Sequence, residues 1–258
     1  MPRLVAMLAL PRSARLATWA TAWLAGEASL DDVVDRVQGG DEPHTVEGVP
    51  GSPGPASLAT ALAALRARGA RALLLALPRP GDPLGLAGGP EVTGAAVLAG
   101  EAAVAYGTGV ALVPRVEAFG PPGDVGHLVS WGWFPAGERG DLPDVAEADR
   151  VLRESLLEAA ATLTDLDVAT WRPEVAQLLE DVRGAAPAEP LPRPYPPRAQ
   201  ALAAQAARLW AVVDFALDDD GGALTTTAAG SRRAALLPLE SAARRALVAA
   251  CASVGGRR

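Results

Sequence analysis

The sequence predicts an α+β or α/β fold, with a mixed β-sheet and flanking helices in about residues 1–138 and an all-helical part in about residues 139–258. One observation is a helical pattern, a glycine and a buried-strand pattern in direct succession over residues 57–78, an order typical of an α/β layer. Another is a series of strand-like apolar runs before residue 138. The third is an almost continuous helical periodicity from Asp141 onward.

The composition predicts an interior of small and aliphatic side chains. Of the 258 residues, 50% are hydrophobic but only 4% are aromatic. Ala, Leu and Val must therefore fill most of the core, and the six tryptophans are its expected large anchors. A chain of this length can bury one large core or two smaller ones, and we expect two.

Two helices are expected first. The earlier one shows an apolar stripe at helical spacing, formed by Leu16, Trp19, Ala20, Trp23 and Leu24. The next begins at SLDDVVDRV, where Ser29 is a suitable N-cap and Asp32 follows three residues later, as in a capping box. This pattern predicts a second helix of about nine residues.

A third helix and a buried strand are expected next. The segment SLATALAALRARG has leucines at helical spacing, and Gly69 is placed to end the helix. RALLLALP, residues 71–78, is a continuous apolar run of strand length. A turn-rich loop is expected over 81–94, followed by strands over 95–106 and 109–118 that are joined as a hairpin through Gly107–Gly109.

The last strand of the predicted mixed sheet is HLVSWGWF, residues 127–134. Alternation places His127, Val129, Trp131 and Trp133 on one face, and Leu128, Ser130 and Phe134 on the other with Gly132. The favoured interpretation is that Trp131 and Trp133 are buried against a helix, with His127 at the start of the strand. The alternative is that this face lines a functional site.

The C-terminal part, residues 139–258, is expected to consist of helices. One begins near Asp141, a second runs from about Pro173 to Gly184, a third carries a nearly heptad stripe from Leu202 to Leu217, and the last begins near Pro238. A proline-rich segment at residues 185–198, with six prolines, is neither helix nor central strand. It is interpreted as a semi-rigid spacer, with a PxxP ligand as the alternative.

Several classes of chemistry are excluded by residues that the chain lacks. It contains no Lys and no Asn, which excludes a Schiff-base or phosphate-loop lysine and a Cys-His-Asn triad. Cys251 is the single cysteine, so no internal disulfide and no cysteine-based zinc site can form. The carboxylates of DDDGG, residues 218–222, lack EF-hand spacing. We expect no metal and no cofactor.

The expected location is the cytoplasm. No apolar run reaches the length of a membrane span, and arginines interrupt the apolar N-terminus too early for a typical secretory signal. Residues 230–258 hold six arginines and one glutamate, whereas residues 141–167 hold eight acidic residues and two arginines. Pairing of these segments explains both charge runs. Because the net charge is −7, nucleic-acid binding through the Arg-rich C-terminal helix, at Arg244 and Arg245, is only a remaining alternative.

A ligand pocket, if the chain has one, is expected beside the loop at residues 78–90, which contains Asp82 and leaves the carboxyl end of the buried strand. The other candidate ligand-binding residues are Arg115, whose guanidinium suits an anion, Asp124, His127 and Trp131. The loop lacks the spacing of a phosphate loop.

Two groups of residues in the sequence are of catalytic types. Asp124, His127 and Ser130 do not suit a hydrolytic triad, because Ser130 points to the opposite strand face from His127. His44, beside Asp41 and Glu42 in DEPH, could join His127 in an acid–base or sparse metal site, although nothing in the sequence brings the two histidines together.

Three stretches, RALLLALPRPGDPLGLAGGPE, GTGVALVPRVEAFGPPGDV and the C-terminal DDDGGALTTTAAGSRRAALLPLESAARRALVAA, resemble parts of uncharacterised proteins from GC-rich actinobacteria. The resemblance covers most of the chain and implies a widespread cytoplasmic family of unknown function. It implies no catalytic residues.

The function that we expect is a non-catalytic binding or protein-interaction role, with a protein partner or a second copy of the chain as occupant. Catalytic residue types are absent or scattered along the sequence. The alternative is a small-molecule enzyme or ligand-binding protein with a pocket near His127, Arg115 and the loop at 78–90.

Overall fold

The computed structural model describes residues 9–121, 124–137, 144–165, 190–218 and 226–254. The chain divides into two compact units. The sheet unit comprises Pro11–Leu142, Leu191–Pro196 and Cys251–Arg258, and the helical unit comprises Met1–Leu10, Pro143–Pro190 and Pro197–Ala250. Residues 191–196 of the proline-rich segment thus belong to the sheet unit. The domain boundary near residue 138 and the role of residues 185–198 as a spacer stay predictions.

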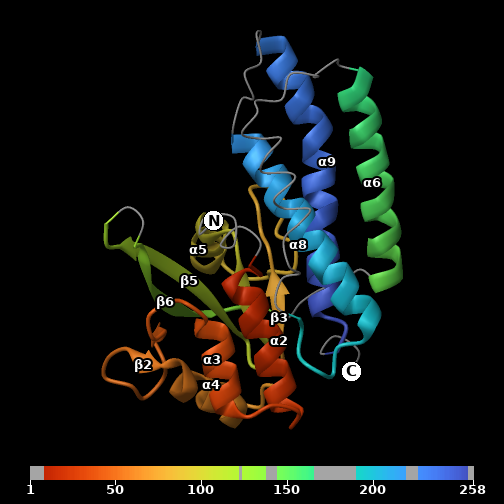
Figure 1. The fold of residues 1–258 in the computed structure, drawn as a ribbon. Helices are drawn as coiled ribbons and strands as arrows, with labels where there is room; N and C mark the ends of the chain where they lie inside the picture. The colour runs from red at the N-terminus through yellow and green to blue at the C-terminus, as the bar shows by residue number, and fades with distance from the viewer. Residues whose placement is uncertain (1–8, 122–123, 138–143, 166–189, 219–225, 255–258) are drawn as a thin grey trace. The chain divides into compact units, whose positions relative to one another are not determined.

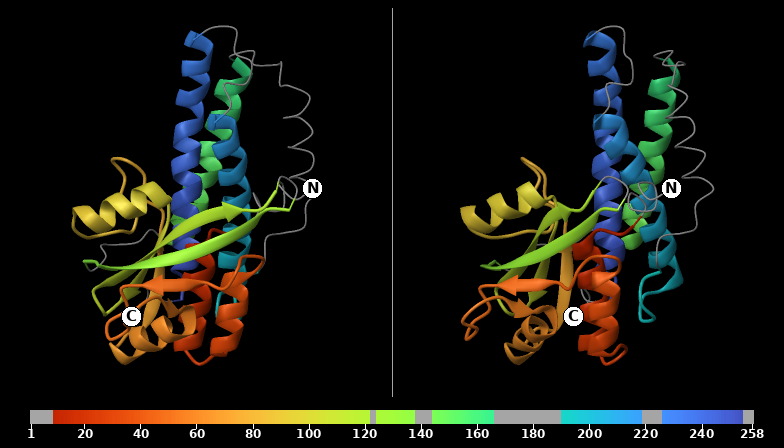
Figure 2. Two further views of the ribbon diagram at one scale, coloured as in Figure 1. Left: turned by 90° about the vertical axis from the view of Figure 1, so that its left-hand side faces the viewer. Right: turned by 60° about the vertical axis from the view of Figure 1, so that its left-hand side comes forward.

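A mixed sheet with flanking helices forms the sheet unit, as predicted (Figures 1 and 2). Its six strands lie in the order β2-β1-β6-β5-β4-β3. Only the β1–β6 pair is parallel. The strands are β1 (Thr45–Glu47), β2 (Ala56–Ser57), β3 (Ala72–Ala76), β4 (Ala102–Tyr106), β5 (Val110–Phe119) and β6 (Gly126–Pro135).

The helices of the sheet unit cover both faces of the sheet. They are α2 (Arg12–Leu24), α3 (Leu30–Gln38), α4 (Leu58–Ala67) and α5 (Pro90–Ala99). Figure 1 shows α5 on the opposite side of the sheet from α2 and α3. Under α5 lies an apolar cluster of small and aliphatic side chains that includes Val92, Ala96, Val104 and Val113. The core is therefore built mainly from Ala, Leu and Val, as the composition predicts.

Local sequence signals place the ends of several helices where they were expected. Ser29 and Asp32 form a capping box at the start of α3. Ser57 caps α4, and Gly69 follows that helix with a positive φ of 90°. The β4–β5 hairpin turns through Gly107 and Gly109, which have φ values of 87° and 69°. Residues other than glycine rarely adopt this left-handed backbone conformation, so the two glycines account for the turn.

Residues 95–99 were predicted to begin a strand, and this prediction is wrong. They form the second half of α5, and the strand starts only at Ala102. Pro90 occupies the first turn of the helix, and Gly100 ends it in a left-handed conformation. The small apolar residues of this segment show no clear helical or strand periodicity. Pro90 and Gly100, at the two ends, therefore indicate the helix better than the apolar run does.

The expectation that each tryptophan anchors the core is also too broad. Among the described residues, Trp131 is the fully buried tryptophan. Trp19 and Trp23 are half-buried on α2, where Arg36 and Arg66 lie 5.3 Å and 5.1 Å from their ring centroids. These two rings therefore contact cations at the edge of the core instead of filling its centre.

The helical unit contains α6 (Val145–Asp165), α8 (Pro197–Asp218) and the part of α9 (Thr226–Cys251) up to Ala250. Arg198 of α8 pairs with Asp149 of α6 at 3.3 Å. The last helix was expected to begin near Pro238, but α9 begins at Thr226 and continues through that proline. Pro238 and Ala234 are both exposed, so water can bond the carbonyl that the missing N–H leaves.

Other expectations for the C-terminal part fall partly outside the described residues. The helix predicted over 173–184 and most of the acidic DDDGG segment lie there. The stripe predicted on α8 is buried at Leu202, Ala206 and Val213. None of the helices in the described part of the chain has the length and apolarity that a membrane span needs.

The side-chain hydroxyl of Thr21 forms hydrogen bonds with the backbone of the edge strand β3. Thr21 of α2 accepts a hydrogen bond from the backbone N–H of Leu73 and donates one to its carbonyl, both at 2.9 Å. Both groups are buried, so this hydroxyl satisfies two polar atoms that water cannot reach. The backbone groups of Leu73 are therefore not available to pair with another strand.

Thr21→Val is therefore expected to lower the free energy of unfolding by about 1–3 kcal/mol, because it leaves the Leu73 N–H and carbonyl without partners. Denaturant unfolding followed by circular dichroism measures the change. Thr18→Val is the matched control: the buried Thr18 hydroxyl bonds only carbonyls of its own helix, at Ala14 and Arg15. Equal losses in the two variants would contradict the role of Thr21.

Candidate functional site

Asp41, in the loop between α3 and β1, is the centre of a buried polar cluster. Arg12 of α2 binds it in a bidentate manner: Nε donates to Oδ2 and a terminal nitrogen to Oδ1, both at 2.7 Å. Arg15, one turn later, lies 3.6 Å from Oδ2. The Asp41 side chain is only 7% exposed. The carboxylate thus joins the start of α2 to the loop that leads into the sheet.

Both histidines of the chain contact the same carboxylate. His44 Nε2 lies 3.3 Å from Asp41 Oδ2, and His127 Nδ1 lies 3.6 Å from Oδ1. Trp131 of β6 donates its indole N–H to His44 Nδ1 at 3.2 Å. Because Nδ1 accepts this bond, the neutral His44 ring carries its proton on Nε2 and donates it to Asp41.

Charge neutralisation keeps Asp41 ionised. Burial acts to raise its pKa, but hydrogen bonds from His44 and Arg12 and the positive charges of Arg12 and Arg15 outweigh burial, so the pKa lies well below the ordinary value. An ionised carboxylate with so many fixed partners is a poor proton donor or acceptor at neutral pH. Asp41 is therefore suited to hold the start of α2 and the two histidines together through ion pairs and hydrogen bonds.

His44 and His127 differ in access to solvent. The His44 side chain is 1% exposed and both ring nitrogens are engaged, so it has no position left for a substrate. The His127 side chain is 37% exposed. Its backbone carbonyl accepts a hydrogen bond from the Glu42 N–H at 3.0 Å. Of the two histidines, only His127 can therefore meet a molecule from solution.

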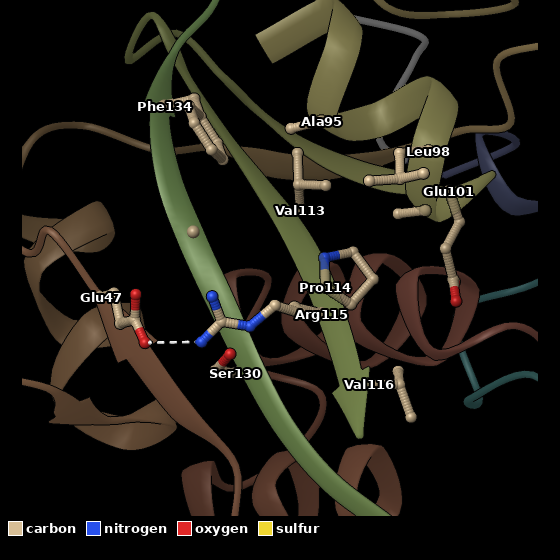
Figure 3. A pocket seen from close by; sticks show the side chains of 12 residues that line it. Glu47, Ala95, Leu98, Glu101, Val113, Pro114, Arg115, Val116, Ser130 and Phe134 are labelled. Atoms are coloured by element: carbon tan, nitrogen blue, oxygen red, sulfur yellow. Dashed lines mark hydrogen bonds and ion pairs between the residues drawn. The ribbon is translucent and has the colours of Figure 1, made fainter. Parts of the chain in front are cut away.

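A pocket of about 550 Å³ lies on the opposite face of the sheet, between α5 and strands β5 and β6 (Figure 3). Ala95, Leu98 and Ala99 of α5 and Val113 and Phe134 of the strands supply its apolar walls. Its polar side chains are those of Glu47, Glu101, Arg115 and Ser130. In Figure 3, Glu47, Arg115 and Ser130 gather at one end, away from Phe134 and Ala95. The pocket is thus polar at this end and apolar near Phe134 and Ala95, and Glu101 lies apart from the other polar groups, beside Leu98.

Arg115 is held at the rim by carboxylates. One terminal nitrogen lies 3.3 Å from Glu47 Oε1, and Nε lies 3.5 Å from Glu117 Oε1. The Arg115 side chain is 65% exposed. Ser130 is its direct neighbour across the β5–β6 pair. The guanidinium that the sequence suggests as an anion-binding group therefore already has two anionic partners.

The glycine at position 132 shapes the pocket wall. A Cβ atom at this position would collide with the ring of Phe134. Phe134 lies two residues further on, on the same face of β6, and its ring lines the apolar end of the pocket. The absent side chain thus lets the Phe134 ring lie along the sheet.

Glu101, directly before β4, was not expected in a site. Its pKa is raised because burial disfavours the charged carboxylate, although a hydrogen bond from the Ser13 N–H at 2.7 Å and the charges of Arg12 and Arg15 oppose the shift. Glu101 also lines the pocket. It therefore lies between the pocket and the first turn of α2.

The structure separates the five predicted ligand-binding residues. Arg115 lines the pocket, whereas His127 and Trp131 belong to the Asp41 cluster on the other face of β6. Asp124 is exposed in the β5–β6 connection, and Asp82 forms two backbone hydrogen bonds with Arg79 within its loop. No residue of the loop at 78–90 lines this pocket. His127 does meet a carboxylate, but that of Asp41 instead of Asp124.

His44 and His127 lie near each other in the structure, although no feature of the sequence indicates it. The two histidines come together because β1 lies parallel to β6, with Thr45 opposite Ser130. Such pairing between distant segments leaves no local pattern. Among the described residues, no group of three or more His, Cys, Asp or Glu side chains could hold a metal ion.

Comparison with known proteins gives two consecutive family matches. Residues 13–148 match the Rv1486c-like protein, N-terminal domain, and residues 146–248 match the Rv1486c-like protein, C-terminal domain. Two relatives from strains of Mycobacterium tuberculosis, the uncharacterized proteins MT1533 and Rv1486c, are each 34% identical over 211 residues, which cover 66% of this chain and 72% of the relative. No solved structure matches the chain.

Asp41→Asn is expected to destabilise the protein by about 3–5 kcal/mol at neutral pH, because it removes the anion that Arg12 and Arg15 share. The pH dependence should change as well. A lowered folded-state pKa contributes stability that is present above the unfolded value of 3.8 and is lost as the pH falls toward the folded value. Unfolding measured between pH 6 and pH 3 should therefore lose part of its acid dependence in the variant.

Asp31→Asn, which changes an exposed acid in the first turn of α3, is the control for that experiment. It should lower stability by less than about 1 kcal/mol. A similar loss in both variants, or an unchanged acid limb in Asp41→Asn, would contradict the proposed electrostatic role of Asp41.

The tautomer of His44 gives a second prediction. In neutral-to-alkaline solution, ¹⁵N NMR of the imidazole should show the proton on Nε2, since Nδ1 accepts from Trp131. Trp131→Phe should remove that acceptor bond and shift the Nδ1 resonance of His44, whereas the His127 resonances should move less. Protonation of His44 on Nδ1 in the unchanged protein would contradict the geometry.

Proposed function

The chain belongs to the Rv1486c-like protein family, and we propose that its sheet unit is a non-catalytic binding module for a small amphipathic molecule. The observation that supports this most directly is the pocket between α5 and the β5–β6 pair. Its volume of about 550 Å³ is in the range of ordinary small-molecule sites.

The pocket lining favours a particular kind of ligand. An apolar part of the ligand would lie against Val113, Phe134 and the alanines of α5. A polar end would meet Glu47, Arg115 and Ser130, which together accept and donate hydrogen bonds. The lining holds two carboxylates and one guanidinium, and that guanidinium is paired with Glu47 and Glu117. We therefore propose a neutral or cationic polar group, and not an anion.

A binding role is favoured over catalysis by the position of the titratable groups. His127 is the histidine that solvent reaches, and it is not among the side chains that line the pocket. The pocket carboxylates are partnered: Glu47 binds Arg115, and Glu101 accepts the Ser13 N–H. No nucleophile with an adjacent base lines this pocket.

Location and nucleic-acid binding are part of the same proposal. We propose a cytoplasmic protein, since its single cysteine is buried and forms no disulfide, as is common in a reducing compartment. We propose no nucleic-acid role for the C-terminal helix. In support, Arg244 is buried and donates to Glu240 at 2.8 Å, so this guanidinium is poorly placed to neutralise a phosphate.

Ala95→Trp tests the pocket, because a large ring at this wall position would occupy the space that a ligand needs. The unchanged full-length protein should bind the neutral apolar dye Nile red with a stoichiometry of one, and the variant should lose at least about tenfold in affinity. Gly94→Trp is the matched control. It adds a tryptophan to the same helix at an exposed position where a new Cβ contacts nothing.

Circular dichroism and thermal unfolding confirm that both variants keep the fold. If Ala95→Trp binds the dye as well as Gly94→Trp does, or if the unchanged protein binds no dye, the proposal of a ligand pocket is wrong. Native mass spectrometry of protein purified from its own host would then identify a natural ligand by mass.

A further inference from the structure

Strand β5 has one edge that is only partly paired. β6 pairs with it along its entire length, from Val110 to Phe119. On the other edge, β4 pairs only with residues Val110–Leu112. Within the described residues, no strand pairs with the second half of β5 on that side, and residues 115–119 are exposed. Among the described residues, no other strand therefore takes up the outward-facing backbone groups of this edge.

The β5–β6 hairpin also presents apolar side chains to solvent. Val116 is 39% exposed, Phe119 is 43% exposed and Leu128 is 49% exposed. Leu98, at the end of α5 and on the rim of the pocket beside β5, is 91% exposed. Exposed apolar side chains beside a free strand edge are typical of a surface that another chain covers.

The charges along this edge are self-complementary. In an antiparallel pair of identical strands related by a two-fold axis, the axis passes through one residue, and the residues on either side of it face each other. Residues 115, 116 and 117 are Arg, Val and Glu. An axis at Val116 places Arg115 opposite Glu117 of the second copy, and Glu117 opposite its Arg115. An axis at Arg115 or Glu117 would instead place like charges opposite each other.

We propose that a second copy of this chain pairs with β5 through residues 114–118, antiparallel and with the two-fold axis at Val116. The result is a continuous sheet across two subunits in which Arg115 and Glu117 form two symmetric ion pairs. Pro114 lacks an N–H, so the pair that it would form with residue 118 of the second copy has at most one hydrogen bond, and the proposed pairing depends on the other backbone groups of the segment and on the ion pairs. Pro114, Arg115 and Val116 also line the pocket, but the inference is argued from the strand edge and its charges and needs no ligand.

Cysteine cross-linking tests the register. In the proposed pair the two Val116 Cα atoms lie about 5.5 Å apart, within the range for a disulfide. Val116→Cys in the full-length chain should thus give a covalent dimer with the thiol oxidant diamide. Ala118→Cys is the matched control, because its two copies would lie about 14 Å apart. The unchanged protein sets the background, since Cys251 is buried.

Charge exchange tests the ion pairs. The unchanged protein should be a dimer by light scattering and sedimentation, and Arg115→Glu or Glu117→Arg alone should raise its dissociation constant at least about tenfold. The double variant Arg115→Glu/Glu117→Arg should restore the dimer, because the exchanged charges are again self-complementary. Glu47→Gln, which removes the other partner of Arg115, should leave the dimer intact.

A protein that stays monomeric throughout the concentration series would overturn the proposal. Pro114, Arg115 and Glu117 would then act as groups that protect an edge from pairing. A dimer that resists both single charge reversals and does not cross-link at position 116 would also overturn it, since another surface must then hold the subunits together.

Discussion

The buried polar cluster around Asp41 connects parts of the sheet unit that lie far apart in sequence. It joins the first turn of α2, the loop after α3 and the face of β6 that carries Trp131. Burying a carboxylate and guanidinium groups is expensive, so the cluster is favourable only when its members are all in place. The relation between α2 and the sheet is therefore specified by a few hydrogen bonds as well as by apolar packing.

Alternation along β6 divides the two kinds of chemistry. Trp131 and His127 face the buried polar cluster around Asp41, whereas Ser130 and Phe134 face the pocket. One strand thus contributes to a closed structural cluster on one face and to an open pocket on the other. On the pocket face, Gly132 has no side chain and so leaves room for the Phe134 ring.

The sequence predicted elements whose ends have a local cause. The capping box at Ser29, the end of α4 before Gly69 and the glycine turn between β4 and β5 were all placed correctly. α5 was missed because its alanine-rich sequence suits several structures, and α9 was begun too late because an exposed proline can lie inside a long helix. The chemistry of the site was harder to predict. His44, which contacts both Asp41 and Trp131, reaches the indole through the parallel pairing of β1 and β6, for which no local pattern exists.

The hydroxyl group of Thr21 limits how the protein can assemble. It occupies the backbone groups of Leu73 on one outer strand of the sheet, and the other outer strand, β2, has only two residues. Neither end of the sheet is a good template for strand addition, so the second half of β5 is the long edge left open in the described part. Once this edge pairs with the same edge of a second copy, its backbone groups cannot bond a third strand. Association through β5 would therefore stop at two subunits and could not continue into a fibre.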